Sequence, residues 1–308
     1  MKNIEKTDIT RRTFIRGGIA AGILVSISPS AVFAGENQGP EIWVIHGEDK
    51  IKLMKKCLEI INANGGLGKA RNSLALKVNA GWDRMPEEGA NTNPILVDEF
   101  LKGCREAGIK EIVLPEHSCH PANKTFIKSG IFDAAKKHDA AMIDLGTDKK
   151  SFIKVNLARG VKLKEVEISN YFTESDIVVN MPVAKHHSGA GLTMAMKNWM
   201  GAVKDRKFWH KNDLHQCIAD MATIIKPNWT IIDATRTMYD GGPQGPAKNL
   251  KIQDILIVSK DQVAADAYAA KTLFPKEIYE KTKYIEIAGE MNLGIVDVEK
   301  MNVRKFEV

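Results

Sequence analysis

The sequence contains only four cysteines, Cys57, Cys104, Cys119 and Cys217, and no two of them have a C-x-x-C spacing. A ferredoxin-type cluster motif is therefore absent. In an oxidising compartment the four thiols could form two disulfides in three pairings. Buried free thiols explain Cys57, Cys104 and Cys217 equally well.

The sequence also lacks a strong excess of one charge. The formal net charge is +6, residues 1–34 carry +3 of it, and aromatic residues make up 6% of the chain. There is no basic tail and no stripe of Lys and Arg interleaved with aromatics, so nucleic acid is not an expected partner. After the N-terminal segment no run reaches the ~18 apolar residues of a membrane span. The 308 residues, 44% of them hydrophobic, can still bury a sizeable core.

The N-terminal segment resembles a twin-arginine export signal. A Thr10–Arg16 stretch with Arg11 and Arg12 precedes the uncharged residues 17–33, and Val32-Phe33-Ala34 suits a signal peptidase. A membrane anchor is the alternative, but serines and a proline interrupt an apolar stretch that falls short of ~20 residues. We therefore expect residues 1–34 to be a signal peptide recognised by the twin-arginine export machinery. The mature protein should be soluble and periplasmic or otherwise extracytoplasmic, and a metal ion or another cofactor could be inserted before export.

Short apolar runs alternate with helical patterns through residues 35–308, which predicts a single α/β domain. One helix between successive strands implies a mostly parallel, doubly wound sheet with helices on both faces. Residues 151–172 break the alternation and predict a small antiparallel insert. The expected strands are Ile42–His46, Leu74–Val78, Glu111–Leu114, Ala141–Leu145, Ile177–Met181, Thr230–Asp233 and Ile255–Ser259. The expected helices are Lys50–Ala63, Pro94–Ala107, Ile131–Lys137, Thr193–Met200, Leu214–Ile225, Val263–Leu273 and Ile278–Ala288.

Polar side chains follow four of these strands. Open parallel sheets bind ligands at the carboxyl ends of their strands, so we expect one shared site there, although loops are polar in any case. The expected substrate-binding residues are Asn79, Asp83, Gly189, Gly191, Thr193, Lys197, Asn198 and Arg236, and the expected catalytic residues are Lys185, His186, His187, Asp233 and Asp240.

Each role has a chemical reason. A glycine turn that opens a helix directs backbone N–H groups outward, so the turn from Gly189 to Thr193 predicts an anion site with Lys185 beside it. A histidine moves protons near neutral pH, so either His186 or His187 is the expected base. Asp233 or Asp240 is its expected orienting carboxylate.

The loop after the third strand contains His117, Cys119 and His120. These side chains combine nitrogen and sulfur donors, so they are candidate metal ligands. Their spacing departs from standard zinc sites, and a metal usually recruits ligands from more than one segment. A redox-active or disulfide-forming Cys119 is the alternative interpretation.

Several short motifs resemble domain-of-unknown-function family 362. They are Asn91-Thr92-Asn93-Pro94, Ser129-Gly130-Ile131, Val179-Asn180-Met181-Pro182 followed by Lys185, Met196-Lys197-Asn198-Trp199-Met200-Gly201, Ile232-Asp233-Ala234 and the Gly241–Pro246 loop. The resemblance implies no settled activity. Its members are often exported by the twin-arginine route, and some carry an iron–sulfur ferredoxin module, which this chain lacks. A more distant similarity is to nickel-pincer lactate racemases, which use Lys and His beside a cofactor.

The leading hypothesis is an exported enzyme that binds a small anionic substrate or cofactor and uses Lys, His and Asp for acid-base chemistry. The alternative is a non-catalytic metallocentre, iron–sulfur-associated or redox accessory protein that uses Cys119 and the nearby histidines.

Overall fold

The computed structural model describes residues 39–67 and 72–308. The predicted signal peptide lies outside these residues. Within these two ranges no helix is long and apolar enough to cross a bilayer.

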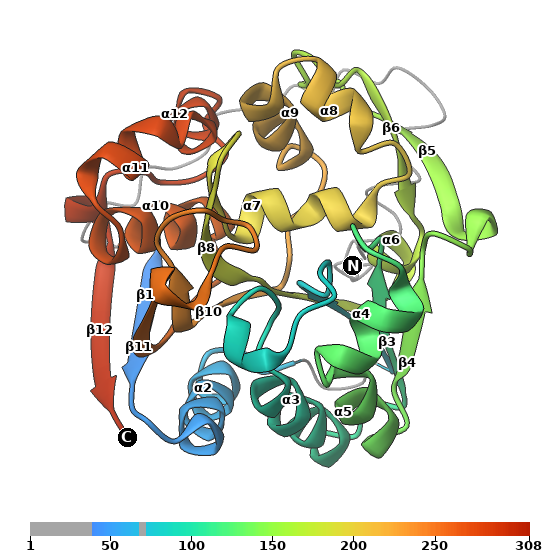
Figure 1. The fold of residues 1–308 in the computed structure, drawn as a ribbon, viewed down its shortest axis with the longest axis vertical. Helices are drawn as coiled ribbons and strands as arrows, with labels where there is room; N and C mark the ends of the chain where they lie inside the picture. The colour runs from blue at the N-terminus through green and yellow to red at the C-terminus, as the bar shows by residue number, and fades with distance from the viewer. Residues whose placement is uncertain (1–38, 68–71) are drawn as a thin grey trace, which may run out of the picture.

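A ten-stranded, mostly parallel sheet runs through the centre of the molecule, as predicted (Figure 1). Its main order is β12-β1-β11-β10-β7-β2-β3-β4, and β8 pairs with both β10 and β9. β11 runs antiparallel to β1 and β10, and β9 runs antiparallel to β8. The strands are β1 (Glu41–His46), β2 (Ser73–Val78), β3 (Glu111–Glu116), β4 (Ala141–Asp144), β7 (Ile177–Met181), β8 (Val183–His187), β9 (Gly191–Thr193), β10 (Trp229–Met238), β11 (Leu250–Ser259) and β12 (Asn302–Glu307).

Helices cover both faces of the sheet, because successive strand residues point to opposite sides. Leu74 and Leu76 of β2 pack into one core with α2, α3 and α5, whereas Ala75 joins a second core with α7, α9 and α10 (Figure 1). The helices are α2 (Lys50–Ala63), α3 (Pro94–Glu106), α4 (Ala122–Lys128), α5 (Ile131–Lys137), α6 (Tyr171–Glu174), α7 (Ala195–Asn198), α8 (Lys207–Lys211), α9 (Leu214–Met221), α10 (Gln262–Leu273), α11 (Lys276–Lys281) and α12 (Lys283–Glu290). The described residues also form short 3₁₀ helices at Pro86–Glu88, Lys149–Ser151, Trp199–Ala202, Ala247–Asn249 and Val298–Lys300.

Local signals set where the first helices begin. The Asp49 side chain accepts the N–H groups of Ile51 and Lys52 at the start of α2. Asn93 accepts the N–H of Ile95 at the start of α3, with Pro94 as its first residue. These caps use the orphan N–H groups of a helix N-terminus, which is why both starts could be predicted.

The predicted insert is a separate two-stranded antiparallel sheet of β5 (Phe152–Asn156) and β6 (Glu165–Ser169). The loop between β5 and β6 is held by the buried Asp220 of α9, whose carboxylate accepts the backbone N–H groups of Val161, Lys162 and Leu163. These bonds join the insert to the main domain.

Five elements differ clearly from the predictions. α9 ends at Met221 and not at Ile225, and β11 begins at Leu250 and not at Ile255. The segment expected to begin a helix at Thr193 first forms β9, which pairs with β8 in a hairpin, so α7 begins at Ala195. β10 continues to Met238 because its second half pairs with β11 and β8. The helix expected over Ile278–Ala288 ends at Lys281, and a new helix begins after Thr282. β8, β12, α4, α6 and α8 were not predicted.

Candidate functional site

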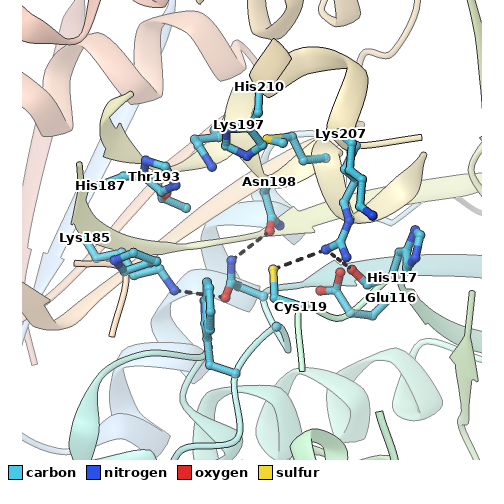
Figure 2. A pocket seen from close by; sticks show the side chains of 17 residues that line it. Glu116, His117, Cys119, Lys185, His187, Thr193, Lys197, Asn198, Lys207 and His210 are labelled. Atoms are coloured by element: carbon cyan, nitrogen blue, oxygen red, sulfur yellow. Dashed lines mark hydrogen bonds between the residues drawn. The ribbon is translucent and has the colours of Figure 1, made fainter. Parts of the chain in front are cut away.

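A cavity of about 260 Å³ lies beyond the carboxyl ends of β2 and β3 (Figure 2). Asn79 follows β2, and Glu116 ends β3. The other walls come from β8, β9, α7 and the start of α8, so segments far apart in the sequence meet there.

The floor of the cavity is a buried polar network. Lys77 and Glu116 form an ion pair at 2.8 Å, and both side chains are almost completely buried. Asn198 donates to Asn180 Oδ1 at 2.8 Å and to the Lys77 carbonyl at 3.2 Å, and accepts from Asn79 at 3.3 Å. These polar groups satisfy one another, so the negative charge of Glu116 is already balanced by Lys77 and does not repel an anion in the cavity.

Lys185 lies in the wall formed by β8. Its Nζ donates to Asn79 Oδ1 at 3.1 Å and to the Ala90 carbonyl. Burial lowers the pKa of Lys185 to about 7, and the neighbouring Lys197 charge acts in the same direction, while Cys119 opposes it. The amine is therefore partly neutral at physiological pH.

Lys197 comes from α7 and is only 8% exposed. Across residues 39–67 and 72–308 its ammonium has no hydrogen-bond acceptor and no ion-pair partner. Burial lowers the pKa of Lys197 to about 8. The buried Thr193 hydroxyl, on the same cavity, also has no partner there. Unsatisfied buried polar groups are costly, so these two favour a bound polar ligand.

His187 contributes a neutral ring to the same cavity. Its Nδ1 accepts the N–H of Gly189 at 3.1 Å, which places the proton of the neutral ring on Nε2. Burial, with the nearby lysines and His210, lowers the pKa of His187 to about 2. The His210 ring stacks on it at a centroid distance of 6.2 Å. His187 is therefore a neutral N–H donor at physiological pH.

All four cysteines are free thiols. Cys119 is exposed, and the other three are buried. Arg206 Nη1 donates to Cys119 Sγ at 3.2 Å and to the His117 carbonyl at 2.7 Å. Figure 2 shows Cys119 and Lys197 directed toward the same cavity. The four basic side chains Lys185, Lys197, Arg206 and Lys207 line it with one carboxylate, Glu116, which is already paired with Lys77. The site is therefore suited to an anion.

Half of the residues expected at the site line this cavity. These are Asn79, His117, Cys119, Lys185, His187, Thr193, Lys197 and Asn198. The others lie elsewhere: Asp83, His120, His186, Gly189, Gly191, Asp233, Arg236 and Asp240.

The residues outside the cavity have structural contacts of their own. Asp233 is buried in β10 and accepts the N–H of Asn93 at 2.8 Å and the Thr235 hydroxyl at 2.7 Å. His186 Nδ1 accepts the N–H of Gly242. Arg236 donates to the Glu87 carbonyl, and Asp83 pairs with Lys128. In the described part of the chain neither Asp233 nor Asp240 hydrogen bonds to a histidine, so the expected His–Asp pairing is absent there.

The helix-opening glycine turn was a wrong prediction. Gly191 and Thr193 belong to β9, and α7 begins only at Ala195. The N–H groups of Ala195 and Met196 are already taken by the buried carboxylate of Asp266, at 2.7 and 3.0 Å. The anion-binding character of the cavity therefore comes from side-chain cations. Lys185 is also completely buried and does not lie at an exposed rim.

The metal ligands expected in the third loop point to different partners. His117 Nδ1 bonds to the Val203 carbonyl at 2.8 Å, and His120 Nδ1 accepts the N–H of Asp83 at 3.2 Å. Cys119 faces Arg206. In the described ranges no three His, Cys, Asp or Glu residues are placed to hold a metal ion, so this expected ligand set is not assembled.

Sequence reasoning missed several important residues. Lys77 had a usable signal, because a lysine inside the apolar strand Ser73–Val78 must find a buried carboxylate. Arg206, Lys207 and His210 had none, since a polar stretch before a short helix looks like an ordinary exposed loop.

The comparison with known sequences identifies the family. The sequence profile of a domain of unknown function, DUF362, matches residues 74–271, which include the cavity residues from Asn79 to Pro243. The chain belongs to the DUF362 family. This confirms the resemblance found in the sequence motifs. The two lysines and the Cys119 loop therefore lie within the DUF362 domain itself.

A curated relative is the thylakoid-associated protein sll1697 of Synechocystis sp., 23% identical over 203 residues. The match covers 62% of this chain, and the chain spans 60% of the length of that relative. Among solved structures, a Thermotoga maritima protein matches with a TM-score of 0.48 and 11% identity, over 80% of this chain and 60% of that one. The lactate racemase apoprotein of Thermoanaerobacterium thermosaccharolyticum matches with a TM-score of 0.46 and 14% identity, over 76% and 57%.

Proposed function

We propose that this DUF362 protein is an exported enzyme that binds a small anionic substrate in the cavity and moves a proton with Lys185. The observation that carries the proposal is Lys197, a lysine that is 8% exposed, whose ammonium has no partner in residues 39–67 and 72–308 and which lines a cavity with more basic than acidic side chains. An anionic ligand would supply the missing partner. The twin-arginine pattern around Arg11 and Arg12 supports export.

Lys185 is suited to the role of general base. A neutral amine has two N–H bonds and one lone pair, and Asn79 Oδ1 and the Ala90 carbonyl occupy two donor positions. The third position is left for a lone pair that can accept a proton. Because the pKa of Lys185 is about 7, a large fraction of the side chain is in the neutral, basic form near neutral pH. The Nε2–H group of His187 can donate to a negatively charged oxygen of the substrate.

Binding is tested by thermal shift with small hydroxycarboxylates, ketocarboxylates and phosphorylated compounds. At least one anion should raise the melting temperature of the wild type, and Lys197→Met should weaken that anion's binding roughly tenfold because a charge-assisted contact is lost. Lys136→Met removes the same charge from the exposed surface of α5, so it should bind like the wild type. Equal binding by all three proteins would remove Lys197 from the site.

Proton transfer is tested by following exchange of substrate C–H groups with deuterated water by NMR. The exchange rate should rise through about pH 7 as Lys185 loses its proton, and fall above about pH 8 as Lys197 loses its charge. Lys185→Met should abolish exchange, and an anion bound by that variant would show that the pocket is intact. Binding without exchange in the wild type would instead support a non-catalytic anion-binding protein.

A further inference from the structure

The cavity contains a nucleophile that the proposed proton transfer does not use. Cys119 is exposed, and its sulfur faces the cations that would hold the substrate (Figure 2). Cys119, Lys185 and Lys197 line the same cavity. Any anion that approaches these lysines therefore also approaches the sulfur.

The position of the sulfur is fixed by its surroundings. The Cys119 N–H donates to the Gly81 carbonyl at 3.0 Å, which anchors the loop to the segment after β2. From the other side Arg206 donates to Cys119 Sγ at 3.2 Å and to the Ser118 carbonyl at 2.9 Å. The sulfur therefore accepts a hydrogen bond from the Arg206 guanidinium, which holds it in place beside the cavity.

Lys197 and Thr193 provide independent evidence that a polar ligand enters beside this sulfur. Lys197 and Thr193 are both more than nine-tenths buried and line the cavity, and neither the Lys197 ammonium nor the buried Thr193 hydroxyl has a partner in the described ranges. The other thiols are poor competitors. Burial raises the pKa of Cys57 and of Cys104, and it raises the pKa of Cys217 to about 12.

We infer that Cys119 is a reversible thiolation site for small anionic disulfides, and that the mixed disulfide closes the anion pocket. The Cys119 thiolate attacks one sulfur of the reagent, a new S–S bond forms, and the reagent's own S–S bond breaks. The other half leaves as a thiolate and takes a proton from water. The disulfide is itself the oxidant. The closing of the pocket, though not the thiolation, rests on the proposed function.

The test compares disulfides of different charge. Dithiodiglycolate is anionic, 2-hydroxyethyl disulfide is neutral and cystamine is cationic. Their rates are followed by intact mass spectrometry, and each is divided by the rate with a synthetic peptide of residues 115–123, which corrects for intrinsic reactivity. The corrected rate should be roughly tenfold higher for the anion than for the neutral reagent and lowest for the cation, because the cavity attracts anions.

Matched variants assign the effect to the cavity. Lys197→Met should reduce the preference for the anion, whereas Lys136→Met should keep it, and high salt should weaken it in the wild type. Cys119→Ser should gain no adduct. Corrected rates that do not depend on reagent charge, or an adduct on another cysteine, would overturn the thiolation site.

Closure has a separate readout. Once thiolated, the wild type should lose thermal stabilisation by anions, and dithiothreitol should restore it. Cys119→Ser should respond to anions before and after the same treatment. Thiolated protein that still binds anions as before would overturn the closure. If no anion stabilises any untreated protein, the proposed function fails, while the charge series still decides the thiolation site.

Discussion

At the scale of single residues, the site depends on two buried lysines in different surroundings. Lys185 has two oxygen acceptors and loses its proton near pH 7, whereas Lys197 has none among the described residues and loses its proton near pH 8. Burial is the main cause of both shifts, because an ammonium is poorly solvated inside a protein. The same burial that lowers the pKa of Lys185 makes an unpartnered Lys197 ammonium costly to the fold.

This cost predicts a pH-dependent effect of Lys197→Met on stability. The pKa of Lys197 is about 8 when folded against an ordinary value of 10.5, so between these values the unfolded chain binds more protons and stability rises with pH. The wild type should therefore gain up to about 3 kcal/mol relative to Lys197→Met between pH 8 and pH 10.5. Urea unfolding at several pH values measures it. Lys136→Met should show no such trend, and parallel curves for the wild type and Lys197→Met would contradict the burial argument.

At the scale of elements, the β8–β9 hairpin positions both lysines. Lys185 lies in β8, and β9 is followed almost directly by α7, which contains Lys197. Gly191 has a φ of +73° and lies against α11 and Thr282, where a Cβ atom would come within 2.4 Å of the Thr282 hydroxyl. The hairpin therefore needs glycine at this position for close packing. Gly189 differs, because a Cβ atom there would come no closer than 3.6 Å to any neighbour.

A pair of alanine substitutions tests this role of the hairpin. Gly191→Ala should destabilise the protein by about 1–3 kcal/mol, from left-handed strain and the contact with Thr282. It should also weaken anion binding, since β9 leads into α7. Gly189→Ala is the control and should lie within about 0.5 kcal/mol of the wild type. Denaturant unfolding measures both, and equal effects of the two would mean that the packing of Gly191 is unimportant.

At the scale of the whole molecule, the site is built where strands from both halves of the sheet meet. β2 and β3 bring Asn79 and the Glu116–Cys119 loop, and β8 with α7 brings the lysines from about a hundred residues away. Between them Lys77 and Glu116 are paired beneath the cavity at 2.8 Å. Such a site forms only when the whole domain has folded.

Export itself is tested by replacing Arg11 and Arg12 with Lys. The twin-arginine route requires the guanidinium pair, whereas a general secretory route depends on positive charge alone. The double variant should therefore stay in the cytoplasm with its signal peptide attached, as cell fractionation and immunoblotting would show. If the double variant, like the wild type, appeared outside the cytoplasm as a shortened protein, the twin-arginine assignment would be excluded.

Local chemistry made the elements predictable. The period of apolar residues predicted α2, and the Asn93-Pro94 cap predicted the start of α3, because both signals act within one turn of a helix. The same signals misled at Gly191, where a glycine turn can open a helix or close a hairpin. The choice of a hairpin depends on pairing between β8 and β9 and on the contact with Thr282, neither of which is a local property.

The sequence by itself determined the family, the α/β class, the antiparallel insert and half of the residues that line the cavity, since all of these follow from short motifs and from strand ends. Only the tertiary structure decided that Asp233 anchors the Asn93 loop, that Arg206 reaches Cys119 and that Lys197 has no partner in the described residues. The physical reason is that burial, and with it the protonation of a lysine, depends on every segment packed around it. Those segments are far apart in the chain, and no local sequence pattern shows that they pack together.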